Sequence, residues 1–132
     1  MARILVVDDE RDARDLVVRH LLADGYDVFA GADADEALAA VRSHGQPDVA
    51  VLDVDLPGTD GVALLGELRR HRPTLPAVFV TVLWSAEDIG RIRATGGTYL
   101  AKPFTADALR DAVRRCLPTA TPEGAVTPEG AA

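Results

Sequence analysis

The sequence predicts an α/β protein in which a parallel five-stranded sheet is covered by helices on both faces. Five short apolar runs alternate with five segments of helical periodicity, and the connections between them are short. This alternation is typical of parallel strands that are joined by crossover helices. The apolar composition of the expected strands also suits burial on both faces of a sheet.

The first two strand and helix segments establish the pattern. Residues 3–7 (RILVV) form a continuous apolar run that ends at a group of acids. In residues 11–25, apolar positions recur at helical spacing, and the segment stops at a glycine. Residues 26–30 (YDVFA) indicate the second strand. Residues 33–45 indicate a helix that begins at an aspartate N-cap with a glutamate three residues later.

The next two pairs continue the alternation. Residues 47–53 (PDVAVLD) indicate the third strand, and residues 62–72, which a proline follows, indicate the third helix. Residues 76–81 (PAVFVT) indicate the fourth strand. Residues 85–96 indicate a helix with a serine cap and a glycine in its interior, which weakens it.

The last strand and helix precede a change in composition. Residues 98–101 (TYLA) indicate the fifth strand, and residues 105–117 indicate the fifth helix. Beyond them the chain contains mainly small residues, prolines and glycines, with the near-repeat TPEGA occurring twice. We therefore expect one domain over residues 1–117, and a disordered tail or linker over residues 118–132.

The bulk properties restrict the class of function. A chain of 132 residues supports one domain with a real core. The formal net charge of -7 argues against direct nucleic-acid binding. The single cysteine, Cys116, fits a reducing compartment, and the first apolar run is too short for a signal peptide or a membrane span. We expect a cytoplasmic protein with no membrane association.

Polar residues follow the expected strands at their carboxyl ends. The first strand is followed by Asp8 and Asp9, the third ends at Asp53, the fourth ends at Thr81, and Lys102 follows the fifth. Each residue alone is compatible with a helix cap, a turn or a solvated charge. Ligands of open parallel α/β sheets bind at the carboxyl ends of the strands, however. The convergence of these residues therefore predicts a binding site at this edge.

The residue types at this edge predict a particular chemistry. Three clustered carboxylates repel one another unless a cation lies among them. Hard oxygen ligands in this number favour magnesium (Mg2+). A metal ion beside a carboxylate, with a hydroxyl and an ammonium group opposite, is suited to binding a phosphoryl group.

With these residues the sequence resembles the receiver domain of two-component response regulators, from Ala2 to about Leu117. The resemblance rests on four motifs in the family's order: VVDDE, VLDVDLPGTDG, VFVT and YLAKPF. It implies a doubly wound (βα)5 sheet with the flavodoxin-like strand order 2-1-3-4-5. It also implies a protein that is not an enzyme and that acts in a phosphorelay or a similar signalling pathway.

The resemblance assigns a role to each motif. Asp53 would accept a phosphoryl group from a sensor histidine kinase or a histidine phosphotransfer protein. Mg2+ would be bound by Asp9 and Asp53 directly, by Asp8 through water and by the backbone carbonyl of Asp55. A downstream protein target would receive the signal by binding to the face formed by the fourth helix, the fifth strand and the fifth helix.

The remaining implied roles concern the switch. Thr81 would move its hydroxyl onto the phosphoryl group, Tyr99 would turn inward behind it, and Lys102 would bind a phosphoryl oxygen. The Lys102–Pro103 peptide bond is expected to be cis. Lys102 is also the only lysine in the chain, beside 13 arginines. A compact ammonium group can reach a single oxygen, whereas the wider guanidinium favours bidentate partners.

Three positions depart from the usual family pattern. Val82 narrows access to the phosphoryl group, Leu83 cannot hydrogen-bond an attacking water, and the Asp55 side chain adds negative charge. We expect these residues to modulate access and to slow hydrolysis of the phosphorylated form. Trp84, in the same loop, is expected to report movement of Thr81 through its fluorescence.

The residues leave alternatives open for the functional class and for the extent of the protein. Asp-x-Asp at Asp53 and Asp55 also resembles the first motif of haloacid-dehalogenase-like phosphatases. That family requires further metal-binding acids after its lysine, however, and here only the helical Asp107 and Asp111 follow Lys102. The chain is either a stand-alone receiver or the excised receiver of a longer regulator. The cognate kinase, the input signal, the downstream target, the oligomeric state and the phosphoryl lifetime cannot be deduced from the sequence.

Overall fold

The computed structural model of the protein describes residues 2–82 and 85–118. Within these ranges, five strands alternate with five helices. The strands are β1 (Arg3–Val7), β2 (Asp27–Gly31), β3 (Val49–Leu52), β4 (Ala77–Thr81) and β5 (Thr98–Ala101). The helices are α1 (Arg11–Ala23), α2 (Ala34–His44), α3 (Gly61–Leu68), α4 (Ala86–Ala94) and α5 (Ala106–Cys116). The expected tail, from residue 119 onward, lies outside the described residues.

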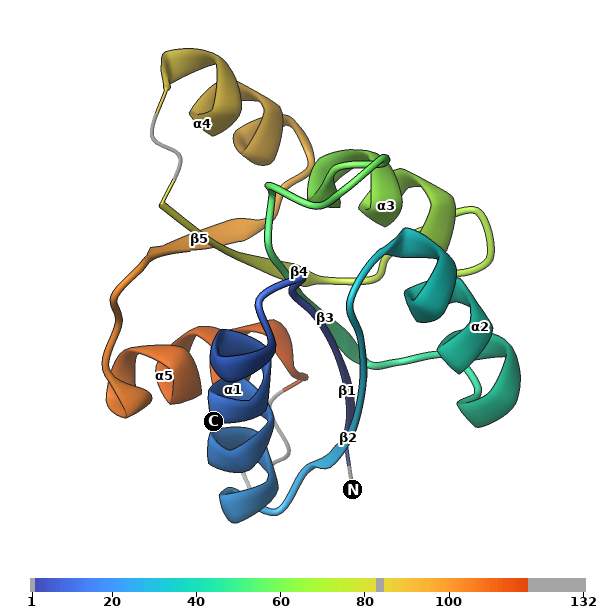
Figure 1. Cartoon of the computed structure of the whole chain (residues 1–132), viewed down its shortest axis with the longest axis vertical. Helices are drawn as coiled ribbons and strands as arrows, with labels where there is room; N and C mark the ends of the chain where they lie inside the picture. Colours follow the sequence, from blue (N-terminus) through green and yellow to red (C-terminus); the bar gives the residue numbers. More distant parts are fainter. Residues whose placement is uncertain (1, 83–84, 119–132) are drawn as a thin grey trace, which may run out of the picture.

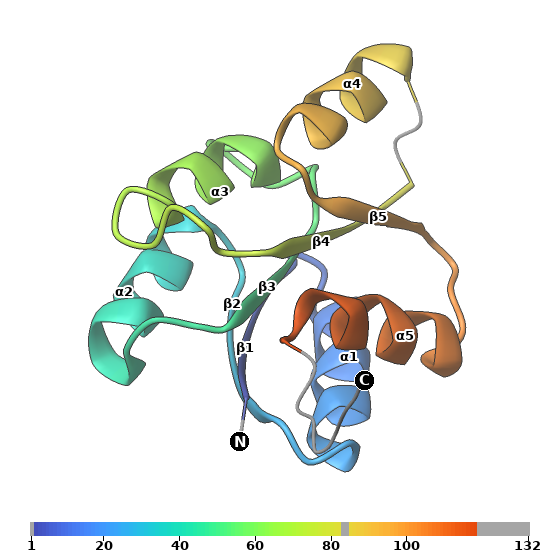
Figure 2. The same cartoon turned by 180° about the vertical axis from the view of Figure 1, so that it is seen from behind.

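All five strands are parallel and form one sheet in the order β2-β1-β3-β4-β5. The helices α1 and α5 cover one face of this sheet, and α2, α3 and α4 cover the other (Figures 1 and 2). The predicted parallel α/β fold and its flavodoxin-like strand order are therefore confirmed.

The two faces of the sheet form separate apolar cores. In β1, Ile4 and Val6 pack in the core under α1 and α5, whereas Leu5 and Val7 pack in the opposite core. All four side chains are buried, which explains why this strand is apolar at consecutive positions.

In the described residues, no helix has the length and apolar character needed to cross a membrane.

Strand register places the carboxyl ends of the central strands level with one another. Val7 of β1 pairs with Leu52 of β3, so that Asp8 and Asp53 follow at the same height. The Asp53 amide donates to the Val7 carbonyl at 2.9 Å. Thr81 pairs with Ala101, and the Lys102 amide donates to the Thr81 carbonyl at 3.1 Å. The backbone hydrogen bonds between neighbouring strands therefore continue one residue beyond the ends of β3 and β5, to Asp53 and Lys102.

Side-chain caps define the starts of four helices. Asp33, Asp60, Ser85 and Thr105 each accept a hydrogen bond from the backbone amide three residues later. This satisfies an amide that has no partner within the helix. The expected caps of the second and fourth helices are thus found.

The third helix differs from its expected range of 62–72. It begins at Gly61 and ends at Leu68. Past this point, the Arg69 side chain donates to the carbonyls of Leu75 and Thr95, at distances between 2.7 and 3.0 Å. These contacts hold the turn that leads into β4, and helical periodicity alone does not predict them.

We predict opposite effects of alanine at two glycines of α3. A Cβ atom on Gly61 would lie 2.1 Å from the Asp53 carbonyl oxygen, whereas one on Gly66 would meet nothing within 4 Å. Gly61→Ala should lower the free energy of unfolding by about 1–3 kcal/mol through overpacking. Gly66→Ala should raise it by roughly 0.5–1 kcal/mol through helix propensity. Urea unfolding of both variants measures this, and equal effects would contradict the close approach at Gly61.

Candidate functional site

The carboxyl edge of the sheet contains three buried polar side chains. Asp8, Asp53 and Thr81 are 4%, 8% and 0% exposed, respectively. They follow or end three adjacent strands, β1, β3 and β4. Buried carboxylates are costly unless they are paired and hydrogen-bonded, so their partners decide how this edge is stabilised.

Lys102 is the partner that two of these groups share. Its ammonium nitrogen Nζ lies 2.8 Å from Asp8 Oδ2 and 3.0 Å from Asp53 Oδ2. The lysine belongs to the connection between β5 and α5, and the Lys102–Pro103 peptide bond is cis. One cation from the edge of the sheet therefore compensates two carboxylates at its centre.

The second oxygen of each carboxylate accepts a hydrogen bond from the backbone. Asp8 Oδ1 accepts from the Glu10 amide at 2.9 Å, and Asp53 Oδ1 accepts from the Asp55 amide at 3.1 Å. Both are aspartate turns in which the side chain bonds to the amide two residues later. Each carboxylate is thereby fixed at both oxygens, and its position relative to the loop that follows is fixed as well.

The environment shifts the pKa values of two groups in this site. Burial raises the pKa of Asp53 above its ordinary value, even though hydrogen bonds from Lys102 and from the Asp55 amide act in the opposite direction. Burial alone would lower the pKa of Lys102, but its hydrogen bonds to Asp8 and Asp53 outweigh this and raise it. Lys102 therefore remains an ammonium group at neutral pH.

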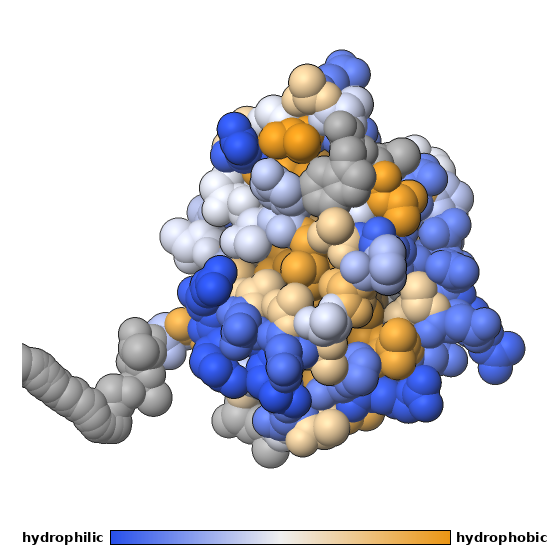
Figure 3. Space-filling model, turned by 90° about the vertical axis from the view of Figure 1, so that its left-hand side faces the viewer, coloured by the Kyte–Doolittle hydropathy of each residue, from blue (hydrophilic) through white to orange (hydrophobic). Residues whose placement is uncertain are grey.

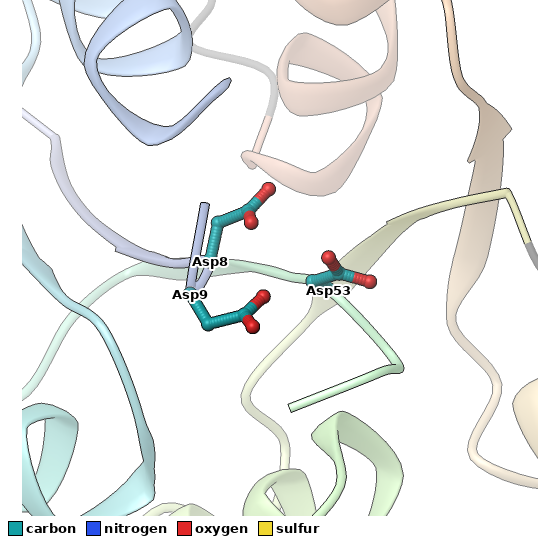
Figure 4. A group of neighbouring side chains, drawn as sticks. All are labelled: Asp8, Asp9 and Asp53. Carbon is teal, nitrogen blue, oxygen red and sulfur yellow. The ribbon is translucent and has the colours of Figure 1, made fainter. Parts of the chain in front are cut away.

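Asp9 completes a group that is suited to a metal ion. Unlike Asp8 and Asp53, it is exposed. One carboxylate oxygen from each of Asp8, Asp9 and Asp53 lies within 4.8 Å of the others. The carboxylates of Asp8 and Asp9 extend toward the side on which Asp53 lies (Figure 4). Hard oxygen donors in this number and proximity fit a divalent cation such as Mg2+.

The other residues expected in the site differ in how far they are buried. Thr81 is buried at the end of β4, and Tyr99 is half-buried in β5, where it packs against the core under α2, α3 and α4. The Asp55 side chain is exposed, and Val82 is 63% exposed. Leu83 and Trp84 lie outside the described residues.

Two features of the site were missed at the level of sequence. The Arg14 guanidinium donates to the Asp8 carbonyl at 3.0 Å and so holds the loop between β1 and α1. A hollow of about 340 Å³ also lies beside Lys102, between α1 and the start of α5. The only feature of the sequence that points to the Arg14 contact is the position of this residue one turn into a helix. No feature of the sequence indicates the hollow.

Fold and site together define a flavodoxin-like α/β protein whose acidic, lysine-bridged site lies at the carboxyl ends of the strands. Residues 4–114 match the family model of the response regulator receiver domain. The chain belongs to this family, whose members are phosphorylation-dependent receivers of two-component systems. Because the chain belongs to the receiver family, the alternative interpretation as a haloacid-dehalogenase-like phosphatase is rejected.

Several relatives are similar over most of the chain. Response regulator MprA of Mycobacterium tuberculosis is 38% identical over 93% of this chain, which spans only 54% of MprA. Sporulation initiation phosphotransferase F of Bacillus subtilis is 32% identical, with 88% of this chain and 94% of that protein covered. The structure of chemotaxis protein CheY4 of Vibrio cholerae has a TM-score of 0.81 at 32% identity, covering 89% of this chain and 99% of that one.

We predict that removing the shared cation and removing one carboxylate change stability in opposite directions. Lys102→Met leaves Asp8 and Asp53 buried without compensation and should lower the free energy of unfolding by about 3 kcal/mol. Asp53→Asn should raise it modestly. Because the pKa of Asp53 is raised, its ionised form is less favourable in the folded than in the unfolded chain, and at neutral pH this cost is fully present.

Urea unfolding at pH 7 in the presence of EDTA measures both effects. Arg93→Gln, on the exposed surface of α4, serves as the control for loss of a positive charge. A Lys102→Met variant as stable as the control would show that the bridge does not compensate the buried carboxylates.

Proposed function

We propose that Asp53 accepts a phosphoryl group from a histidine kinase or a histidine phosphotransfer protein with Mg2+, and that phosphorylation switches a partner-binding face. The observation that carries this proposal is the Asp53 carboxylate. It is buried and shares the Lys102 ammonium with Asp8, and one of its oxygens lies within 4.8 Å of oxygens of Asp8 and Asp9. Membership in the receiver family supports the same reaction.

The metal would be held directly by the side chains of Asp9 and Asp53 and by the backbone carbonyl of Asp55, and through water by Asp8. When bound, Mg2+ neutralises charge on the transferring phosphoryl group. The carboxylates supply the hard oxygen donors that this ion prefers.

In the transfer step, a carboxylate oxygen of Asp53 attacks the phosphorus of the donor's phosphohistidine. A bond forms between this oxygen and phosphorus, and the bond between phosphorus and the donor nitrogen breaks, which returns the electron pair to the imidazole. Lys102 already lies 3.0 Å from Asp53 and is placed to hold a phosphoryl oxygen after transfer. Thr81, from the adjacent strand β4, would donate its hydroxyl to another oxygen, and Tyr99 would follow this movement.

Hydrolysis of the product is proposed to be slow. The exposed Asp55 side chain places negative charge two residues after Asp53, and Val82 follows Thr81 directly. Leu83 is included in this proposal from the sequence alone. Both the added charge and the apolar side chains would hinder an attacking water.

The hollow beside Lys102 supports docking of the phosphoryl donor at this edge. Its apolar lining includes Leu16, Val17, Val82 and Phe104. Leu16 and Val82 are 42% and 63% exposed, so the hollow offers accessible apolar surface next to the charged site. A donor that packs on these residues would present its phosphohistidine to Asp53.

A second surface supports a downstream protein target. The side of the molecule that carries α4, β5 and α5 has apolar residues at its centre and hydrophilic residues around them (Figure 3). This arrangement is typical of a protein-binding face. The chain spans about half of MprA but nearly all of the sporulation phosphotransferase, so the proposal applies both to a stand-alone receiver and to the receiver part of a longer regulator.

We predict that Asp53 is the sole acceptor. Incubation with acetyl phosphate and Mg2+ should add one phosphoryl group, which intact-protein mass spectrometry detects, and Asp53→Asn should abolish it. Asp12→Asn, on the exposed surface of α1, should retain full labelling. Label that persists on the Asp53→Asn protein, or labelling that is independent of Mg2+, would refute the assignment.

We predict that Lys102→Arg preserves the fold but lowers the rate of labelling by about 10-fold or more. The charge is retained, but the planar guanidinium is too wide to replace a single nitrogen that bridges Asp8 Oδ2 and Asp53 Oδ2. Circular dichroism checks the fold, and the initial rate of acetyl phosphate labelling checks the function. A wild-type rate in this variant would show that the site requires only a positive charge.

A further inference from the structure

The helix α4 is attached to the rest of the molecule by few contacts. Ile92 is its one fully buried residue. Two arginines supply polar links to α3, which covers the same face of the sheet. Arg69, just after α3, donates to the Thr95 carbonyl at the end of α4 at 2.7 Å. Arg91, within α4, donates from Nη2 to Asp60 Oδ2, also at 2.7 Å.

The two links differ in strength. Arg69 also donates to the Leu75 carbonyl through Nε at 3.0 Å and Nη2 at 2.8 Å. Two hydrogen bonds thus fix the Arg69 side chain to the turn before β4, and the third joins it to the carboxyl end of α4. Arg91 has one short contact, and its side chain and that of Asp60 are 39% and 33% exposed. A partly exposed pair of this kind contributes only modest stability and can exchange with water. The carboxyl end of α4 is thus held more firmly, and the contact between Arg91 and Asp60 is the one that can break more easily.

Asp60 connects this contact to the acceptor loop, residues 54–60. Its Oδ1 accepts from the Ala63 amide at 2.9 Å and caps α3, while Oδ2 accepts from Arg91. The next residue, Gly61, donates its amide to the Val54 carbonyl at 2.9 Å. Gly61 also packs so closely on Asp53 that a Cβ would lie 2.1 Å from the Asp53 carbonyl oxygen. The backbone at Asp60 therefore cannot shift without moving the residues that adjoin Asp53.

Electrostatics keep this contact charged. Burial would raise the pKa of Asp60, but hydrogen bonds from the Ala63 amide and from Arg91 outweigh it and lower the pKa below its ordinary value. The link between α4 and the acceptor loop is consequently an ion pair at neutral pH.

We propose that Arg91 is a positioning residue for the phosphorylation of Asp53: by pairing with Asp60, it holds the acceptor loop in the geometry that presents the Asp53 carboxylate. This inference rests on the proposed function for its kinetic consequence. The position of α4 and the reactivity of Asp53 are then linked, and the link acts equally in both directions for binding equilibria.

A double-mutant cycle tests this role. The variants are Arg91→Gln, Asp60→Asn and the two combined. Asp60→Asn removes the charge but keeps the helix cap, because asparagine and aspartate are about equally good at this position. Arg93→Gln, exposed on the same helix, is the matched control, and Arg91→Lys tests rescue. The readouts are the initial rate of Mg2+-dependent labelling by acetyl phosphate and the amide NMR shifts of Val54, Asp55 and Gly61.

We expect each single variant to label more slowly by roughly threefold to tenfold, and the double variant to be no slower than either single one. Arg91→Lys should recover part of the rate, and Arg93→Gln should match wild type. The three amides should shift in Arg91→Gln and not in Arg93→Gln. Multiplicative effects in the double variant, or unchanged amide shifts in Arg91→Gln, would overturn the inference.

The same experiment separates the inference from the proposed function. If the wild-type protein takes up no label, the proposed function fails. The amide shifts then decide whether Arg91 positions the acceptor loop, because they require no phosphorylation.

Discussion

A single ammonium group, Lys102 Nζ, lies between two buried carboxylates that are 94 and 49 residues away in the sequence. The three residues follow β1, β3 and β5, so this contact joins the centre of the sheet to its edge. Without the lysine, Asp8 and Asp53 would repel each other in a poorly solvated site; without the carboxylates, the lysine would be a partly buried cation with no partner. The position of the connection between β5 and α5 is therefore tied to the charge state of the site.

This constraint determines what a phosphoryl group on Asp53 would do. It would bring additional negative charge and new acceptor oxygens to the place where Lys102 already has two partners. An ammonium group has three donors, so the lysine would redistribute its hydrogen bonds. Thr81, at the end of the adjacent strand β4, carries a hydroxyl that can donate as well. A response of this kind involves the residues after β4 and β5, the two strands that lie closest to α4 and to the proposed target face.

Much of the fold and part of the site could be predicted from the sequence, because both depend on local patterns. The strand at residues 98–101 follows from the sequence, since a short apolar run between glycines and a lysine leaves little choice. The proximity of Asp8, Asp53 and Lys102 can be predicted because all three follow the carboxyl ends of parallel strands, where such sheets bind their ligands. The end of α3 was missed because it depends on where the Arg69 side chain finds carbonyl partners. The pairing of Arg91 with Asp60 was missed for the same reason: it joins residues 31 positions apart, and only the placement of α4 on the sheet brings them together.

The distribution of these contacts also limits where a switch can operate. The strands lie between two close-packed apolar cores, and a change in either core would cost packing over many side chains. The polar contacts at the carboxyl edge are different. Lys102 with its two carboxylates and Arg91 with Asp60 are hydrogen-bonded pairs that can exchange partners without opening a cavity. Because Asp60 is fixed to the residues next to Asp53 while Arg91 belongs to α4, this edge offers a short path from the proposed acceptor to a helix of the proposed target face, and the rest of the molecule can stay in place.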